Sequence, residues 1–179
     1  MLARTLLASV AVALLAISAS ADDFKLTSDN TKITFTGFKK DGKHVGGFKT
    51  VSGKASVPPK NYTKLELEID IDCDSLYSDD DKLTAHLKAP DFFGVKDNPK
   101  ASFKVTKVEN AKDGIIMTGE LTLLGKTKPI TAAGKMKMDP GSLAIDSTFK
   151  IDRNDWGMTY GKGKIDDLVE VTIAIAAKK

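Results

Sequence analysis

Cysteine and histidine are scarce in this chain of 179 residues. It has one cysteine, Cys73, and two histidines, His44 and His86. A single cysteine excludes an internal disulfide, so the hydrophobic core must supply the stability of the fold. Two histidines far apart in the sequence do not provide a cluster of zinc ligands, and no Gly-x-Ser-x-Gly nucleophile motif accompanies them. We therefore expect no catalytic residues, no metal site and no cofactor.

A strong excess of charge of one sign is also lacking. The chain carries 27 lysines and arginines against 24 aspartates and glutamates, and the lysines are scattered rather than gathered in a long run. Nucleic-acid-binding domains usually concentrate basic residues on one face or along one segment. The composition therefore speaks against a nucleic-acid partner.

Long hydrophobic runs are absent except near the start of the chain. Arg4 precedes an apolar run at residues 6–17, which ends in a small-x-small motif closing at Ala21. This order is typical of a secretory signal peptide, and the run is too short to span a bilayer. We expect residues 1–21 to be a signal peptide that is cleaved near Ala21. Residues 22–179 are then expected to form one soluble, periplasmic or secreted domain that does not span the membrane.

The rest of the chain alternates between apolar and polar residues. In the stretch KLELEIDIDCD, every second side chain from Leu65 to Cys73 is apolar and the others are charged. The segments at 114–124, 143–152 and 168–177 follow the same period of two, and turn sequences such as Asp-Gly and Pro-Gly separate such segments. Alternation of this kind is typical of strands with one buried face, and many such strands joined by tight turns indicate an antiparallel barrel or sandwich. The predicted class is all-β.

The aspartates of the first alternating stretch resemble a calcium loop. Asp70, Asp72 and Asp74 lie two residues apart. A calcium loop of that type also needs a preceding helix, a glycine at its sixth position and a glutamate at its twelfth, where this chain has Ser75 and Asp81. We interpret the three aspartates as the solvent face of a strand.

One short helix is expected directly afterwards. Ser78 is a candidate N-cap, and acidic residues up to Asp81 would lie in the first turn, where the helix dipole favours them. Leu83 and Leu87 are one turn apart, and Pro90 would end the helix.

The aromatic residues leave two interpretations open. Phenylalanines fall on the predicted strands and directly after the helix, and the ordinary role of such residues is to fill the core. A small barrel is either filled by side chains or hollow around an apolar ligand. The alternation alone does not distinguish a filled barrel from a hollow one.

Several longer motifs resemble the YceI-like family. They are AHLKAPDFFGVKDNPKASFKVTKV at 85–108, GELTLLGKTKPI at 119–130, FKIDRNDWGMTYG at 149–161 and DDLVEVTIAIAAKK at 166–179. Together with the opening segments ITFTG and GGFKTVSGKASV, the resemblance covers residues 24–178 in order.

The resemblance implies a fold and a function. The fold would be an eight-stranded antiparallel lipocalin-like barrel with one short helix, following the signal peptide. The function would be binding of a polyisoprenoid or another fatty amphiphile inside the barrel of an exported, often periplasmic, protein. Members of the family are commonly dimeric, so a homodimer is a further expectation.

The expected binding residues combine the family motifs with the aromatic residues of the strands and the apolar face of the helix. Hydrophobic members would line the barrel, while His86 and Arg153 would be the polar groups near its mouth. Asp91 and Asp155 are also motif residues. Their alternative roles are structural: Asp91 would cap a turn, and Asp155 would form an ion pair with Arg153. The complete expected set is Phe35, Phe48, Leu83, His86, Leu87, Phe92, Phe93, Phe103, Phe149, Arg153, Trp156 and Met158.

A different function stays open at this point. A barrel filled by its own side chains would act as an interaction module for an envelope or redox partner, without a bound lipid. A secreted hydrolase is a third possibility, which the missing nucleophile motif disfavours.

Overall fold

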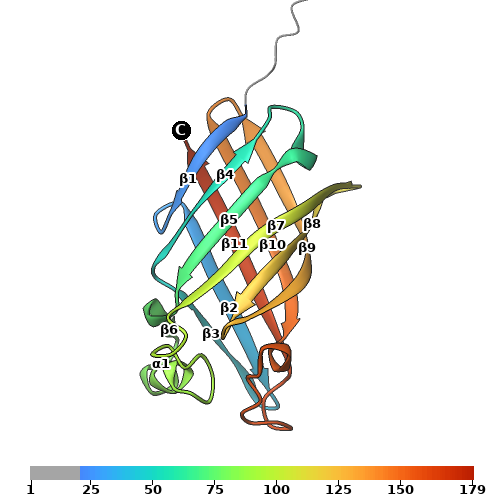
Figure 1. Cartoon of the computed structure of the whole chain (residues 1–179). Helices are drawn as coiled ribbons and strands as arrows, with labels where there is room; N and C mark the ends of the chain where they lie inside the picture. The colour runs from blue at the N-terminus through green and yellow to red at the C-terminus, as the bar shows by residue number, and fades with distance from the viewer. Residues whose placement is uncertain (1–20) are drawn as a thin grey trace, which may run out of the picture.

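The computed structural model describes residues 21–179, so the predicted signal peptide lies outside the described residues except for Ala21. Within them the chain forms one α-helix and eleven antiparallel strands, and the strands belong to a single sheet (Figure 1). The elements are β1 (Asp22–Thr27), β2 (Thr31–Lys39), β3 (Gly42–Phe48), β4 (Val51–Val57), η1 (Tyr62–Lys64), β5 (Glu66–Asp72), η2 (Cys73–Ser75), β6 (Leu76–Ser78), α1 (Asp81–Lys88), β7 (Lys100–Ala111), β8 (Gly114–Leu123), β9 (Lys126–Asp139), β10 (Ser142–Asp152), η3 (Arg153–Trp156) and β11 (Leu168–Lys178), where η marks a 3₁₀ turn.

Six of the strands are halves of three longer, bent strands. β1 and β2, β3 and β4, and β5 and β6 are each separated by two or three residues. β1 pairs with β4 as β2 pairs with β3, and β4 pairs with β5 as β3 pairs with β6. Joined in this way, the eleven segments make eight antiparallel strands. The last strand, β11, pairs with β2 of the first bent strand, which closes the sheet into a barrel. The predicted all-β barrel with one helix is confirmed, although the count of eight holds only when each bent strand is counted whole.

Serine hydroxyls hold the three bends together. The Oγ of Ser28 accepts a hydrogen bond from the Val51 N–H at 3.0 Å, and the Oγ of Ser75 accepts one from the Thr50 N–H at 3.0 Å. Ser75 also donates to the carbonyl of Asp72 at 2.6 Å. Serine side chains offer the backbone this alternative to a ladder bond. The alternation pattern predicted strands here but not their interruptions.

The barrel is more open at one end. β9 pairs with β10 only along Gly134–Asp139, and its first half, from Lys126 to Ala133, pairs with β8 alone. Pro129 lies in that half, where β10 leaves one edge of β9 without a neighbour, and proline suits such an edge because it has no N–H to donate. Figure 1 shows α1 and the segment between β10 and β11 at this open end, with the C-terminus at the other end.

The closed end of the barrel is packed with side chains. Along β10, β11 and β2, the register places Ser147 beside Ile173 and Ile33, and all three are buried. The next inward row towards the open end consists of Phe149, Val171 and Phe35, which are only half-buried. The boundary between the closed and the open end therefore crosses three neighbouring strands at one level. The largest fully buried side chains on the closed side include Phe24, Leu26, Ile115, Met117, Leu143 and Ile145.

The acidic stretch and the helix follow the prediction, with one correction. Asp70 and Asp72 are exposed on the outer face of β5, as expected. The N-cap of α1 is Asp80 rather than Ser78, because the Asp80 carboxylate accepts from the Leu83 N–H at 2.7 Å. Ser78 instead donates to the Asp80 carbonyl at 2.8 Å.

Between residues 21 and 179, no group of histidine, cysteine, aspartate or glutamate side chains is placed to hold a metal ion. No helix in the same range has the length and apolar character needed to cross a membrane.

Candidate functional site

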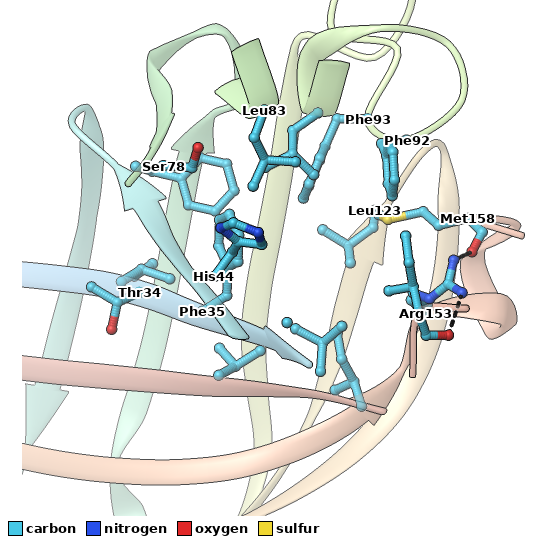
Figure 2. Close-up of a pocket in the computed structure, with 18 of the residues that line it drawn as sticks. Thr34, Phe35, His44, Ser78, Leu83, Phe92, Phe93, Leu123, Arg153 and Met158 are labelled. Atoms are coloured by element: carbon cyan, nitrogen blue, oxygen red, sulfur yellow. Dashed lines mark hydrogen bonds between the residues drawn. The ribbon is translucent and has the colours of Figure 1, made fainter. Parts of the chain in front are cut away.

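A cavity of about 290 Å³ occupies the open end of the barrel (Figure 2). Its walls come from β2, β3, β5, β6, β8, β10 and β11, from α1 and the turn that follows it, and from η3 and the loop at 157–167. Most of the lining residues are apolar, and the polar ones are Thr34, Lys39, His44, Ser78 and Arg153. A concave, mostly apolar site with a few polar groups is the usual form of a small-molecule pocket.

Three aromatic rings line one wall of the cavity. The ring centroid of Phe48 lies 6.0 Å from that of Phe35 and 5.7 Å from that of Phe93, in tilted and edge-on arrangements. Such geometries are the favourable ones for aromatic pairs. A Cβ added at Gly46 would meet the ring of Phe35 at 2.4 Å, so the glycine lets this ring lie against the backbone of β3.

Gly37 helps to keep the cavity open. It lines the cavity from β2, and a Cβ added there would meet no atom within 4 Å. Since its backbone angles are ordinary for any residue, Gly37 contributes by lacking a side chain rather than by an unusual conformation.

Eight of the twelve expected binding residues line this cavity. They are Phe35, Phe48, Leu83, Leu87, Phe92, Phe93, Arg153 and Met158. The other four, His86, Phe103, Phe149 and Trp156, do not.

Three of these four residues, Phe103, Trp156 and Phe149, lie in or against the packed core. Phe103 is buried in the packed core, with its ring over Gly119. Trp156 is also buried there and donates its indole N–H to the carbonyl of Leu121 at 3.2 Å. Phe149 packs against the same core. Their aromatic character predicted the interior correctly, but not which part of it.

Arg153 lines the cavity but uses its hydrogen-bonding capacity on the adjacent loop. Its Nε donates to the Asp166 carbonyl at 3.0 Å, its Nη1 to the carbonyls of Met158 and Tyr160, and its Nη2 to the Ile165 carbonyl at 3.3 Å. A guanidinium has five N–H donors, and the carboxylate of Asp167, at 3.5 Å, takes the fifth. Its carboxylate partner is thus Asp167, not the Asp155 considered from the sequence. Arg153 holds the loop that forms one wall of the cavity.

His86 connects the helix to the same loop from outside the cavity. Its Nε2 lies 3.0 Å from the Asp91 carboxylate, and its ring meets those of Phe92 and Tyr160 edge-on, at centroid distances of 5.0 Å and 4.7 Å. Phe92 and Tyr160 are themselves 5.3 Å apart. These three rings form a rim cluster that joins the helical segment to the loop at 157–167.

Further lining residues were not among those expected from the sequence. The alternation had already assigned Leu121, Leu123, Ile151, Val169 and Val171 to predicted strands, but the register that brings them to the open end is a long-range property. The remaining ones are Ile33, Thr34, Gly37, Phe38, Lys39, His44, Ile71, Ser78 and Ile165.

His44 is the missed residue with the most distinctive chemistry. Its Nδ1 lies 2.9 Å from the carboxylate of Asp79, which also accepts the Val45 N–H at 3.1 Å. The Val45 N–H and the His44 ring lower the pKa of Asp79, so this carboxylate is ionised near neutral pH. No short-range pattern links residues 44 and 79, and only the pairing of β3 with β6 brings them together.

Cys73 is remote from this chemistry. It is buried and does not line the cavity. Burial, together with the nearby Asp72 charge, raises the pKa of its thiol to about 11. A thiol that stays protonated is a poor nucleophile, so packing is its role.

Comparisons with known proteins agree with the fold and its motifs. The model of the YceI-like domain matches residues 24–177. A UPF0312 protein of Serratia proteamaculans is 29% identical over 189 residues, which cover 98% of this chain and 97% of that protein. Protein YceI of Salmonella arizonae is 30% identical over 136 residues, covering 73% of this chain and 71% of that protein.

Solved structures show the same architecture. The crystal structure of BcnA from Burkholderia cenocepacia superposes with a TM-score of 0.77 at 20% identity, over 83% of this chain and 96% of that one. A polyisoprenoid binding domain from Saccharophagus degradans superposes with a TM-score of 0.65 at 13% identity, over 87% of this chain and 97% of that one. With a family match from the first strand to the last and the same barrel in distant relatives, the chain belongs to the YceI-like family.

Proposed function

We propose that this protein binds a long-chain isoprenoid or another amphiphilic lipid in the cavity at the open end of its barrel. It would act outside the cytoplasm, after removal of the signal peptide, by sequestering or carrying the lipid, and it would perform no catalysis. The observation that carries the proposal is the cavity itself. Large apolar side chains that could have filled the barrel instead surround about 290 Å³ of space.

The size of the cavity sets the scale of the binding energy. If a methylene group needs about the 30 Å³ that a water molecule occupies in the liquid, the cavity holds about ten of them. Burial of each methylene contributes about 0.8 kcal/mol, or about 8 kcal/mol in total, which corresponds to micromolar affinity before the costs of immobilising the ligand. A longer chain would extend through the open end.

Similarity to a polyisoprenoid binding domain supports a lipid ligand, and the apolar leader supports export. The two observations are independent of the cavity, because one rests on the fold and the other on residues outside the described part of the chain.

Filling the cavity from Gly37 tests the proposal. In Gly37→Phe the new side chain would start in open space, because no atom lies within 4 Å of the added Cβ, and its ring would take up part of the cavity. The control is Lys32→Phe, which places the same ring on the exposed outer face of the same strand. Delipidated protein would be titrated with farnesol, using displacement of an environment-sensitive fluorescent probe.

We expect Gly37→Phe to weaken farnesol binding at least tenfold while its thermal midpoint stays at or above that of the parent. Lys32→Phe should bind as the parent does. If the parent takes up neither the probe nor farnesol, or if Gly37→Phe binds as tightly as Lys32→Phe, the lipid-binding function is wrong. The filled interaction module would then be the better interpretation.

A further inference from the structure

The cavity has few polar groups that are free to meet the head of an amphiphile. Arg153 uses all five of its N–H donors on the loop, and Ser78 bonds to the Asp80 carbonyl and to the Thr84 hydroxyl at 2.9 Å. The side chain of Thr34 alternates with those of Ile33 and Phe35 and therefore leaves the strand on the other face. The groups that remain are the imidazole of His44 and the exposed ammonium of Lys39.

The ring of His44 is hydrogen-bonded through one nitrogen, and its other nitrogen has no protein partner among the described residues. β3 places His44 opposite Gly37, where the absent side chain leaves room. Asp79 holds Nδ1, and Nε2 has no hydrogen-bond partner among residues 21–179. Figure 2 shows the ring of His44 among the side chains that line the cavity.

The hydrogen bond to Asp79 determines what Nε2 can do. An ionised carboxylate only accepts, so the neutral ring carries its proton on Nδ1 and presents a lone pair at Nε2. The negative charge of Asp79, 2.9 Å from the ring, also disfavours a second anion beside His44. Nε2 is therefore suited to a group that donates a hydrogen bond.

We propose that Nε2 of His44 accepts a hydrogen bond from the head group of the bound amphiphile, and that this head group is a hydroxyl, as in a long-chain alcohol. His44 is then a specificity residue that positions the head at the mouth, while the apolar wall holds the tail. The inference rests on the proposed function, since it names the head-group chemistry of the same cavity. The opposing assignment is an anionic head held by Lys39.

Matched ligands separate the two assignments. The probes are 1-dodecanol, its methyl ether, which keeps the tail and the oxygen but cannot donate, and dodecanoate, which carries a charge. One hydrogen bond of ordinary strength contributes about 1 kcal/mol, so the parent protein should bind the alcohol about fivefold to tenfold more tightly than the ether. In His44→Phe the ratio of the two affinities should fall to about one.

The second histidine supplies the control. His86 also pairs with an aspartate, but it lies outside the cavity. The variant His86→Phe should keep the parent's preference for the alcohol over the ether, whatever it does to the absolute affinities. If His44→Phe does not fold, His44→Leu repeats the test, and the parent's own preference requires no variant.

Three results would overturn the inference while leaving lipid binding intact. They are equal affinities for the alcohol and the ether in the parent, an unchanged preference in His44→Phe, and tighter binding of dodecanoate that is lost in Lys39→Gln. If none of the three ligands binds the parent, the proposed function itself fails together with the inference.

Discussion

The two ends of this barrel are built from the same strands with the same alternation, yet one is filled and the other is hollow. Ile145 and Ile151 show the difference on a single strand. Both face inwards on β10, but Ile145 is completely buried, whereas Ile151 is half-buried and lines the cavity. The period of two determines which side chains face inwards, while strand pairing determines whether they meet each other or surround a space.

The two ends are also held together by different forces. Apolar packing dominates the closed end, where β9 and β10 pair. At the open end that pairing is missing, and polar and aromatic contacts hold the walls instead. Arg153 anchors the loop at 157–167 through its carbonyls, and the rim cluster of His86, Phe92 and Tyr160 joins the loop to the helical segment.

The largest expected effect comes from truncating the two isoleucines. Ile145→Ala should destabilise the protein by about 3–4 kcal/mol, because it removes a packed side chain and leaves a void at the closed end. Ile151→Ala should cost about 1 kcal/mol, since part of that side chain already faces a cavity and has fewer contacts to lose. Urea unfolding, followed by circular dichroism, measures both free energies.

The same pair of variants can show that the two ends do not differ in packing. Equal losses of stability would mean that the open end is packed as tightly as the closed end. A third variant, Asp146→Ala, controls for changes to the strand itself, because Asp146 is exposed between two buried neighbours. Its effect should stay within about 0.5 kcal/mol.

The closed end was the more predictable half. Alternation over residues 64–74, 114–124, 143–152 and 168–177 predicted the inward faces of four strands, β5, β8, β10 and β11, because a period of two is a local property. It did not predict that Phe103 and Trp156 fill the core rather than the cavity. Their placement depends on which residue lies opposite, such as Gly119 beneath the ring of Phe103.

The open end depends on contacts that are distant in sequence. His44 meets Asp79 across 35 positions, and Arg153 binds carbonyls whose positions depend on how the loop at 157–167 folds back. Arg153, Phe92 and Met158, which belong to the family motifs, line the cavity because those motifs mark segments that form its walls. They did not show that the donors of Arg153 are already used.

The next largest loss of stability is expected from a substitution at Arg153. The substitution Arg153→Met keeps much of the side-chain length but removes every donor, so several loop carbonyls lose a charged hydrogen-bond partner. Hydrogen bonds to charged groups contribute about 1.5–3 kcal/mol, and we expect a loss of about 2–3 kcal/mol that is concentrated in the loop. Hydrogen exchange of residues 158–167 and tryptic cleavage at Lys162 and Lys164 should both become faster.

Lys150→Met is the control for the arginine. It removes a cation from the exposed face of the preceding strand and should leave exchange in the loop unchanged. If Arg153→Met exchanges and is cleaved at the parent's rate, the loop does not depend on the guanidinium. The open end would then be held by its aromatic contacts alone.

The smallest loss of stability is expected at Ser147, which lies at the boundary between the two ends. The buried hydroxyl of Ser147 donates to the carbonyl of Ala133 at 2.8 Å, where β9 and β10 separate. Ser147→Ala leaves that carbonyl without its donor and should cost about 1 kcal/mol. Faster exchange should be confined to the neighbouring residues of the two strands, because the packed core on one side and the rim cluster on the other are unchanged.

The adjacent threonine tests whether burial is what makes this hydroxyl matter. Thr148 also makes a hydroxyl hydrogen bond, to Thr172 at 2.9 Å, but on the exposed face of the same strand. Water can replace that bond in Thr148→Val, so its stability should stay within about 0.5 kcal/mol of the parent. If the two variants lose equal stability, or if exchange in Ser147→Ala rises evenly along β10, the buried bond does not mark the boundary. The transition from filled to hollow would then follow from side-chain size alone, and enlarging the inward residues of β10 and β11 should close the cavity without any change in strand pairing.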